Sequence, residues 1–197
     1  MARRVFYSFH YARDVGRANV VKNSWVTKKD REEAGFFDSS AFETAKRTSP
    51  DALKRFLNAQ LEGSSVTCVL IGNQTAYREW VRYEIIRSFV CGKGLVGVYI
   101  NAIPNFSRQV DVAGPDPFRF VGFEIHGNLL KFKEWNGSAW QWYSHIPSMP
   151  AVDVRYWLMD KTNTTFDQLF RSHDWVGSNG YDNIGPWVEA AASQAKR

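Results

Sequence analysis

Three short runs of apolar and β-branched residues, separated by segments with helical spacing, constrain the fold of this chain more than any other feature. The runs extend from Val5 to Phe9, from Val66 to Ile71 and from Leu95 to Ile100. Successive apolar residues are typical of strands covered on both faces, as in a parallel sheet. Because helical segments alternate with these strands, the order favours an α/β fold, a flavodoxin-like parallel sheet flanked by helices.

The segments between the strands carry the expected helices. Residues 14–23 have a rough apolar stripe and predict a first helix. Ser, Pro and Asp at residues 49–51 form a strong helix start, and Gly63 supplies the stop. Another helix is predicted from about Thr75 to Val90, whereas residues 28–47 predict a long loop with short helical pieces.

The chain after residue 103 has a different pattern. Leu129 to Trp135 and Ala139 to Tyr143 flank Asn136-Gly137, a dipeptide that favours a tight turn, and so predict a β-hairpin. The remaining pieces are expected to be a loop and two helical stretches, at residues 104–117, 166–171 and 184–192. We interpret residues 1–197 as one domain, with an α/β core at 1–103 and a decorated C-terminal part at 104–197 that completes it.

Composition narrows the class of protein. A hydrophobic share of 44% suits a globular core, and a net charge of +5 is only mildly basic. A pI near 9.2 and the hairpin tryptophans could suit a nucleic-acid or nucleotide binder. Basic residues are not clustered among aromatic ones, however, so nucleic acid is not an expected partner.

A metal site, a disulfide framework and a membrane-spanning segment are not expected. Cys68 and Cys91 form no paired motif, and His126, His145 and His173 lack the spacing of metal ligands. No apolar run approaches the ~18 residues of a membrane span, and the N-terminus is too short before the first strand for a signal peptide. A cytoplasmic protein without a metal is therefore expected.

Glu84 lies in the middle of an apolar stripe on the predicted helix, between Trp80 and Ile85. A carboxylate there must be paired, protonated or open to a cleft. A structural glutamate held by arginine or backbone amides and a functional glutamate both satisfy this pattern. Counted from Thr75, Glu84 lies roughly 13 Å along the helix, so a cleft would have to extend along the helix flank. The neighbouring charged residues are expected at the surface: Arg78, Glu79, Arg82 and Arg87.

Several stretches together resemble a known family, the TIR-like (Toll/interleukin-1 receptor-like) subunits of Thoeris anti-phage defence systems. The Trp-x-x-x-Glu spacing of Trp80 and Glu84 resembles the helix of NAD-cleaving TIR domains. The similar stretches keep the order of the family along most of the chain: residues 4–11, 19–26, 52–55, 66–72, 80–85, 174–176 and 187–188.

This resemblance implies an activity and partners. Such subunits are activated during phage infection, cleave the nicotinamide–ribose bond of NAD and release a cyclic ADP-ribose isomer that activates a separate effector. NAD is then the substrate, and no cofactor is implied. The resemblance makes Glu84 the catalytic residue, because an anion stabilises the oxocarbenium-like ribose that forms when an N-glycosidic bond breaks. A phage-derived activator and a homo-oligomer on activation are further expectations.

Candidate substrate contacts follow from their positions: Ser8, Phe9, His10, Asp14, Arg17, Asn19 and Trp80. The first three end the first predicted strand, although Phe9 is equally suited to the core. Arg17 could hold a phosphate or lie at the surface, and Asn19 could bind the nucleotide or cap local structure. Trp80 is better suited to the wall of the cleft than to a direct contact. A non-catalytic TIR-type interaction module, with Glu84 kept for structure, is the alternative function.

Overall fold

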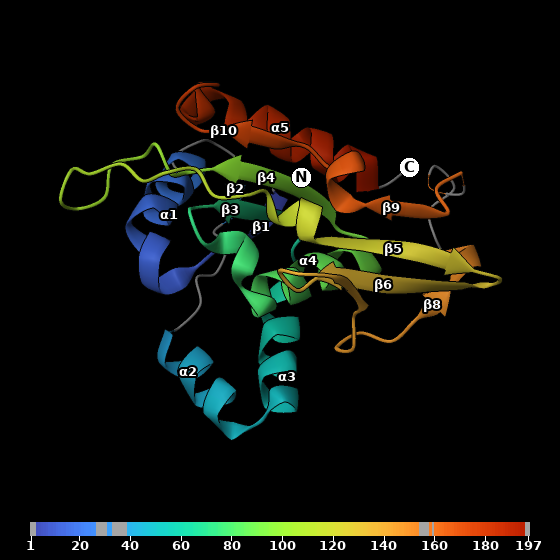
Figure 1. Ribbon diagram of the computed structural model, residues 1–197. Helices are drawn as coiled ribbons and strands as arrows, with labels where there is room; N and C mark the ends of the chain where they lie inside the picture. The colour runs from blue at the N-terminus through green and yellow to red at the C-terminus, as the bar shows by residue number, and fades with distance from the viewer. Residues whose placement is uncertain (1–2, 27–30, 33–38, 154–157, 159, 196–197) are drawn as a thin grey trace.

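The computed structural model describes residues 3–26, 31–32, 39–153, 158 and 160–195, and its centre is a parallel sheet (Figure 1). The strand order is β10-β4-β3-β1-β2, and every pairing in it is parallel. The strands are β1 (Arg3–Ser8), β2 (Arg31–Glu32), β3 (Val66–Ile71), β4 (Gly94–Tyr99) and β10 (Ser172–Asp174). The predicted α/β class with a parallel sheet is confirmed.

β3 lies at the centre of this sheet, and all its side chains are therefore buried. On one face, α1 (Tyr11–Val26) and α5 (Gly180–Ala195) pack their apolar residues on the strands. On the other face, α3 (Pro50–Leu61) and α4 (Glu79–Val90) do the same. Figure 1 shows α5 along one side of the sheet and α3 on the other. Strands covered on both faces explain the unbroken apolar runs of the sequence.

The helix ends predicted from the sequence agree with the structure in some places and differ in others. The Ser49 hydroxyl accepts a hydrogen bond from the Ala52 amide at 3.0 Å, which confirms the predicted start of α3. Gly63 follows that helix with a φ of +74°, a conformation that favours glycine. α1 is longer than residues 14–23. Within the predicted loop at 28–47, the ten-residue helix α2 (Ser39–Thr48) forms, while residues 28–30 and 33–38 lie outside the described residues.

A second sheet, with strand order β7-β6-β5-β9, packs beside the parallel one and is antiparallel. Its strands are β5 (Val121–His126), β6 (Leu129–Trp135), β7 (Trp140–Trp142) and β9 (Asn163–Thr165), and β8 (Met149–Pro150) also pairs with β6. The predicted hairpin of β6 and β7 is confirmed. β5 was not predicted, although apolar residues alternate at Val121, Phe123 and Ile125, and it pairs with β6 along its whole length.

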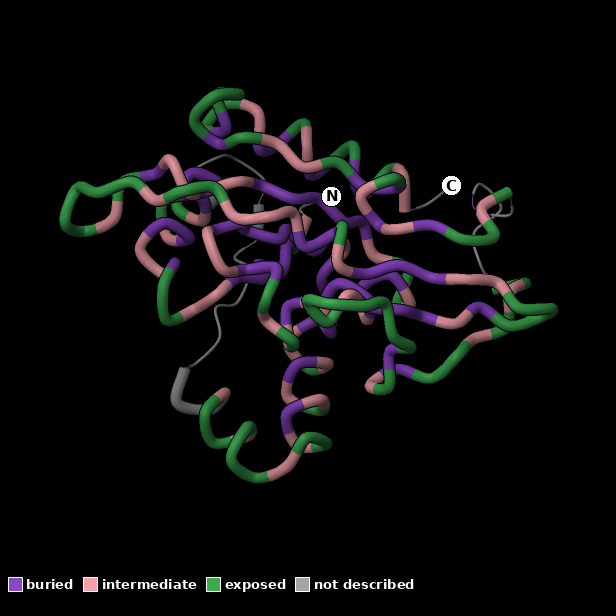
Figure 2. The backbone as a smooth tube through the Cα atoms, in the orientation of Figure 1, coloured by how far each residue is buried: buried purple, intermediate pink, exposed green. Residues whose placement is uncertain are grey.

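The segment predicted to be helical at residues 166–171 differs from that expectation. Only the 3-10 turn η5 (Phe166–Gln168) forms, and the chain then enters β10, which pairs with β4. The parallel sheet and its covering layer thus take their last strand and helix from the chain after residue 103. Figure 2 shows burial running through both sheets, whereas α2 is largely exposed. Within the described part of the chain, no helix combines the length and apolarity that crossing a membrane requires.

Candidate functional site

A cavity of about 500 Å³ opens beyond the carboxyl end of β1. Residues 9–12 line it from the end of β1 and the start of α1, and Phe42, Glu43 and Lys46 line it from α2. The remaining wall comes from residues 77–81 and from Glu84. Side chains at the carboxyl ends of parallel strands commonly form ligand sites, and this volume is in the range of nucleotide-sized ligands.

Glu84 closes the inner end of this cavity and is 3% exposed. The Ser8 hydroxyl, fully buried at the end of β1, donates a hydrogen bond to Oε2 of Glu84. Burial raises the pKa of Glu84 to about 8, and the Ser8 hydrogen bond opposes part of this rise. Among the described residues, Glu84 makes no ion pair with lysine or arginine. The carboxyl is therefore mostly protonated at neutral pH, and a positively charged ligand would favour its ionisation.

The start of α4 determines the depth of Glu84. Thr75 to Tyr77 form a separate 3-10 turn, and Arg78 has an extended conformation with φ −88° and ψ 113°. The α-helix then begins at Glu79 instead of Thr75. Glu84 lies only about 8 Å beyond that start, at 1.5 Å per residue, instead of roughly 13 Å along a helix counted from Thr75. The cavity reaches it without a long channel along the helix.

Ser8 contacts Glu84 but does not itself line the cavity, whereas two other predicted residues, Phe9 and His10, follow β1 and do line it. Phe9 is 5% exposed, and its ring lies 6.0 Å from that of Tyr11. His10 is half-buried, and its Nδ1 is buried without a hydrogen-bond partner among the described residues. Burial, together with the charges of Arg78 and Arg13, lowers the pKa of His10, so its imidazole is neutral at pH 7. Phe9, for its part, belongs to the hydrophobic core and also lines the cavity.

Trp80 forms part of the cavity wall, as the sequence predicted. Its ring lies 5.7 Å from Tyr83 and 5.5 Å from His145, which follows β7 in the chain. His145 is in turn fixed by Glu79, with 2.7 Å between Nε2 and Oε1. The sequence predicts no particular role for His145, yet its ring packs against the indole of Trp80. The second sheet thus helps to position a wall of the cavity.

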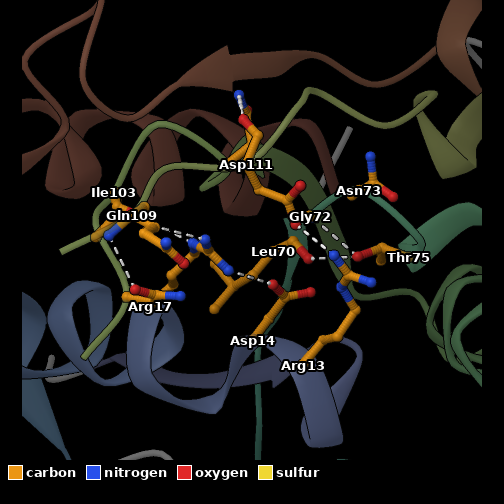
Figure 3. Close-up of polar contacts among 12 residues, drawn as sticks. Arg13, Asp14, Arg17, Leu70, Gly72, Asn73, Thr75, Ile103, Gln109 and Asp111 are labelled. Atoms are coloured by element: carbon orange, nitrogen blue, oxygen red, sulfur yellow. Dashed lines mark hydrogen bonds and ion pairs between the residues drawn. The ribbon is translucent and has the colours of Figure 1, made fainter. Parts of the chain in front are cut away.

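Asp14, Arg17 and Asn19 do not line this cavity, in contrast to the expectation of substrate contacts. Figure 3 shows the polar contacts that Arg17 makes instead. Arg17 is 4% exposed and donates to the carbonyl oxygens of Ile103 at 2.8 Å and Gln109 at 3.3 Å. Its Nη1 lies 3.3 Å from Oδ1 of Asp14, which is also buried. The pair therefore holds the segment after β4 against α1 and leaves no guanidinium for a phosphate. Asn19 is half-buried further along α1.

Two arginines expected at the surface are not ordinary surface charges. Arg78 lines the cavity, where its Nη2 donates to Oε1 of Gln74 at 2.8 Å and its Nε is buried without a partner among the described residues. Arg82 instead forms a largely buried ion pair with Glu134 of β6, with 2.8 Å between Nε and Oε2. The break before Glu79 takes Arg78 out of the helix, whereas Arg82 is largely buried because Glu134 of β6 lies against it.

Metal-binding geometry is lacking in the part of the chain that the structure describes: no three His, Cys, Asp or Glu side chains are grouped as ligands would be. The cavity is instead walled by aromatic rings, with one protonated carboxyl at its inner end and cationic side chains from Arg78 and Lys46. Such a site suits an organic ligand that carries both positive and negative charge.

Comparison with known proteins identifies the family of this chain. The family model described as Thoeris protein ThsB, TIR-like domain, matches residues 6–105, which include the end of β1 and all of α4. A curated protein from Bacillus cereus (strain MSX-D12), named "Putative cyclic ADP-D-ribose synthase ThsB1", is 40% identical over 191 residues. That alignment covers 95% of this chain and 100% of the relative, so the similarity extends well beyond the residues that the family model matches. The chain belongs to the TIR-like ThsB family of Thoeris systems.

Proposed function

We propose that this protein cleaves the bond between nicotinamide and ribose in NAD and releases a cyclic ADP-ribose isomer. One observation carries the proposal: the buried carboxyl of Glu84, bonded to Ser8, ends a nucleotide-sized cavity. The name of the relative that is 40% identical, a cyclic ADP-D-ribose synthase, supports the same reaction class. The enzyme is then an NAD nucleosidase of the ADP-ribosyl cyclase type.

The chemistry follows from the state of Glu84. NAD carries a positive charge on its nicotinamide ring, and this charge next to Glu84 favours the ionised carboxyl that burial alone disfavours. As the glycosidic bond breaks, its electron pair leaves with nicotinamide, and positive charge moves to the ribose. The carboxylate of Glu84 stabilises that charge, while Ser8 holds one of its oxygens in place. Binding energy is therefore gained where the transition state develops charge.

The second half of the reaction is capture of the ribosyl cation. A nucleophilic atom at the adenine end of the same molecule forms the new bond to the ribose carbon, and water does so in the hydrolytic side reaction. The proton that the attacking group loses passes to the carboxylate of Glu84 or to solvent. Aromatic side chains at Phe9, Tyr11, Tyr77 and Trp80 line the cavity. We propose that they limit access of water and favour the folded substrate. Neutral His10, with its buried Nδ1 open to a partner, is placed to hydrogen-bond a ribose hydroxyl.

The same proposal extends to partners. The cyclic product acts on a separate effector protein of the defence system, and a phage-derived component activates the enzyme. Activation involves association of several copies, which would complete the mouth of the cavity beside α2. NAD is consumed as the substrate, and neither nucleic acid nor a membrane takes part.

Release of nicotinamide from NAD tests the function. The protein would be incubated with NAD and lysate of phage-infected cells as the activator source. Wild-type protein should release nicotinamide and a cyclic product, and Glu84→Gln should lose at least a hundredfold in rate while staying folded. Glu189→Gln is the matched control, because Glu189 is exposed on α5, outside the cavity lining, and its carboxylate pairs with Arg3 at 2.6 Å. Equal turnover by Glu84→Gln and wild type would contradict the assignment. Activator-dependent association of copies without any turnover would favour the non-catalytic interaction module instead.

A further inference from the structure

We propose that Arg78 is the diphosphate-binding residue of this cavity and determines its specificity for dinucleotides over nucleosides. This inference rests on the proposed function, because it assigns the part of the NAD molecule that lies next to the ribose at Glu84. Arg78 combines a position in the cavity wall with donor groups that the folded protein leaves open.

The guanidinium of Arg78 is oriented by one hydrogen bond, and it keeps a donor that no acceptor satisfies among the described residues. Nη2 donates to Oε1 of Gln74 at 2.8 Å, which fixes the orientation of the planar group. Nε is buried and has no partner among the described residues. A buried donor without a partner is costly, and in the wall of a cavity a bound ligand can supply the missing acceptor. An arginine fork matches two oxygens of a phosphate, which a lysine cannot do.

The spacing between Arg78 and Glu84 suits one substrate. Glu84 lies about 8 Å along α4 from its first residue, at 1.5 Å per residue, and Arg78 is the extended residue directly before that helix. One ribose 5′-phosphate unit spans such a separation, with its anomeric carbon at Glu84 and its phosphate at Arg78. Arg78 also directly precedes the first residue of α4, where the helix dipole favours negative charge.

Electrostatics around the cavity agree with this placement. Arg78 and His10 both line the cavity, and the positive charge of Arg78 contributes to the lowered pKa of the His10 imidazole. Of the two acidic side chains near the mouth, Glu79 is engaged by His145 at 2.7 Å, and Glu43 is exposed on α2. Lys46, also exposed on α2, adds a second positive charge at the mouth. A diphosphate fits this arrangement better than a neutral ligand does.

Arg13 offers a matched control. It also lowers the pKa of His10, but it does not line the cavity, and its Nη2 pairs with Oδ2 of Asp111 at 2.8 Å. Arg13→Gln therefore removes the same charge near the same histidine without removing a donor from the cavity. Any effect of Arg78→Gln beyond that of Arg13→Gln reports the contact with ligand.

Binding of ADP-ribose and of adenosine, measured by titration calorimetry, tests the inference without any turnover. Arg78→Gln should weaken ADP-ribose binding about tenfold to a hundredfold and leave adenosine binding within about twofold, because only the former carries a diphosphate. Arg78→Lys should restore only part of the loss, and Arg13→Gln should behave as wild type. Gln74→Ala, which keeps the charge but frees the guanidinium, should give a smaller loss for ADP-ribose alone.

Several results would overturn the inference. Equal losses for ADP-ribose and adenosine in both Arg78→Gln and Gln74→Ala would assign Arg78 a structural role. ADP-ribose binding that is unchanged in Arg78→Gln, or absent from wild type, would exclude the diphosphate contact. Failure of the proposed function looks different: NAD turnover is then absent, or independent of Glu84, while ADP-ribose binding still depends on Arg78.

Discussion

Replacement of Glu84 by glutamine should stabilise the folded protein at neutral and alkaline pH, although it removes the proposed catalytic group. The side chain is 3% exposed and keeps its shape in the variant, and the Ser8 hydroxyl can donate to the amide oxygen as it does to the carboxyl. What changes is ionisation. The wild-type carboxyl has a pKa of about 8 when folded and an ordinary value of 4.5, whereas glutamine does not titrate.

The sign of the effect follows from proton linkage. Between pH 4.5 and 8 the folded protein retains a proton on Glu84 that the unfolded chain has released, so wild-type stability falls as the pH rises. Each pKa unit corresponds to about 1.4 kcal/mol, so the advantage of Glu84→Gln grows from near zero at pH 4.5 to about 3 kcal/mol at pH 7. Above pH 8 it levels off at about 4 to 5 kcal/mol, an upper value because a native site relaxes around an ionised group.

Urea titrations at pH 5 and pH 8, followed by the fluorescence of the eight tryptophans, measure this difference. With a slope of about 2 kcal/mol per molar urea, the midpoint of Glu84→Gln should exceed that of wild type by about 1 to 2 M at pH 8 and by much less at pH 5. The exposed Glu189→Gln should change the midpoint little at either pH. A gain that is the same at both pH values, or a loss at pH 8, would refute the reasoning that burial destabilises the ionised carboxyl.

Two further predictions concern residues around Glu84. Ser8→Ala removes a hydrogen bond that lowers the pKa of Glu84, so the pH at which the rate of NAD cleavage rises to half its maximum should increase. An unchanged pH profile would argue against ionised Glu84 as the active form. Arg82→Met leaves Glu134 buried without its partner and should lower the free energy of unfolding by about 3 kcal/mol in thermal or urea denaturation. The double variant Arg82→Met with Glu134→Gln should recover much of that loss, and additive losses would contradict a direct pair.

Patterns confined to a few neighbouring residues were predicted well from the sequence. The start of α3 rests on Ser49 and the residues directly after it, so local chemistry is sufficient. The β6–β7 hairpin likewise follows from one turn between two short runs. The parallel sheet followed from apolar runs at β1, β3 and β4, since strands buried on both faces need no alternation.

Pairings between distant segments could not be predicted in this way. β10 joins β4 across more than seventy residues of sequence, and its three residues carry no strong strand signal of their own. Neither residue type nor spacing states which strand a short polar segment will extend, because the partner's edge supplies the hydrogen bonds. The same holds for His145, which supports Trp80 only because the second sheet folds back on α4.

The sequence alone determined that a carboxylate at Glu84 lies on an apolar helix face, and the family pattern made it the expected catalytic residue. Only the tertiary structure decided the roles of the arginines. Arg17, Arg78 and Arg82 are chemically identical, yet one holds a loop, one faces the cavity and one pairs with β6. A guanidinium binds whichever acceptor folding brings within reach of its long side chain. That choice depends on which segments pack against α1 and α4 and, for Arg78, on where α4 begins, and neither is encoded within a few residues of the arginine itself.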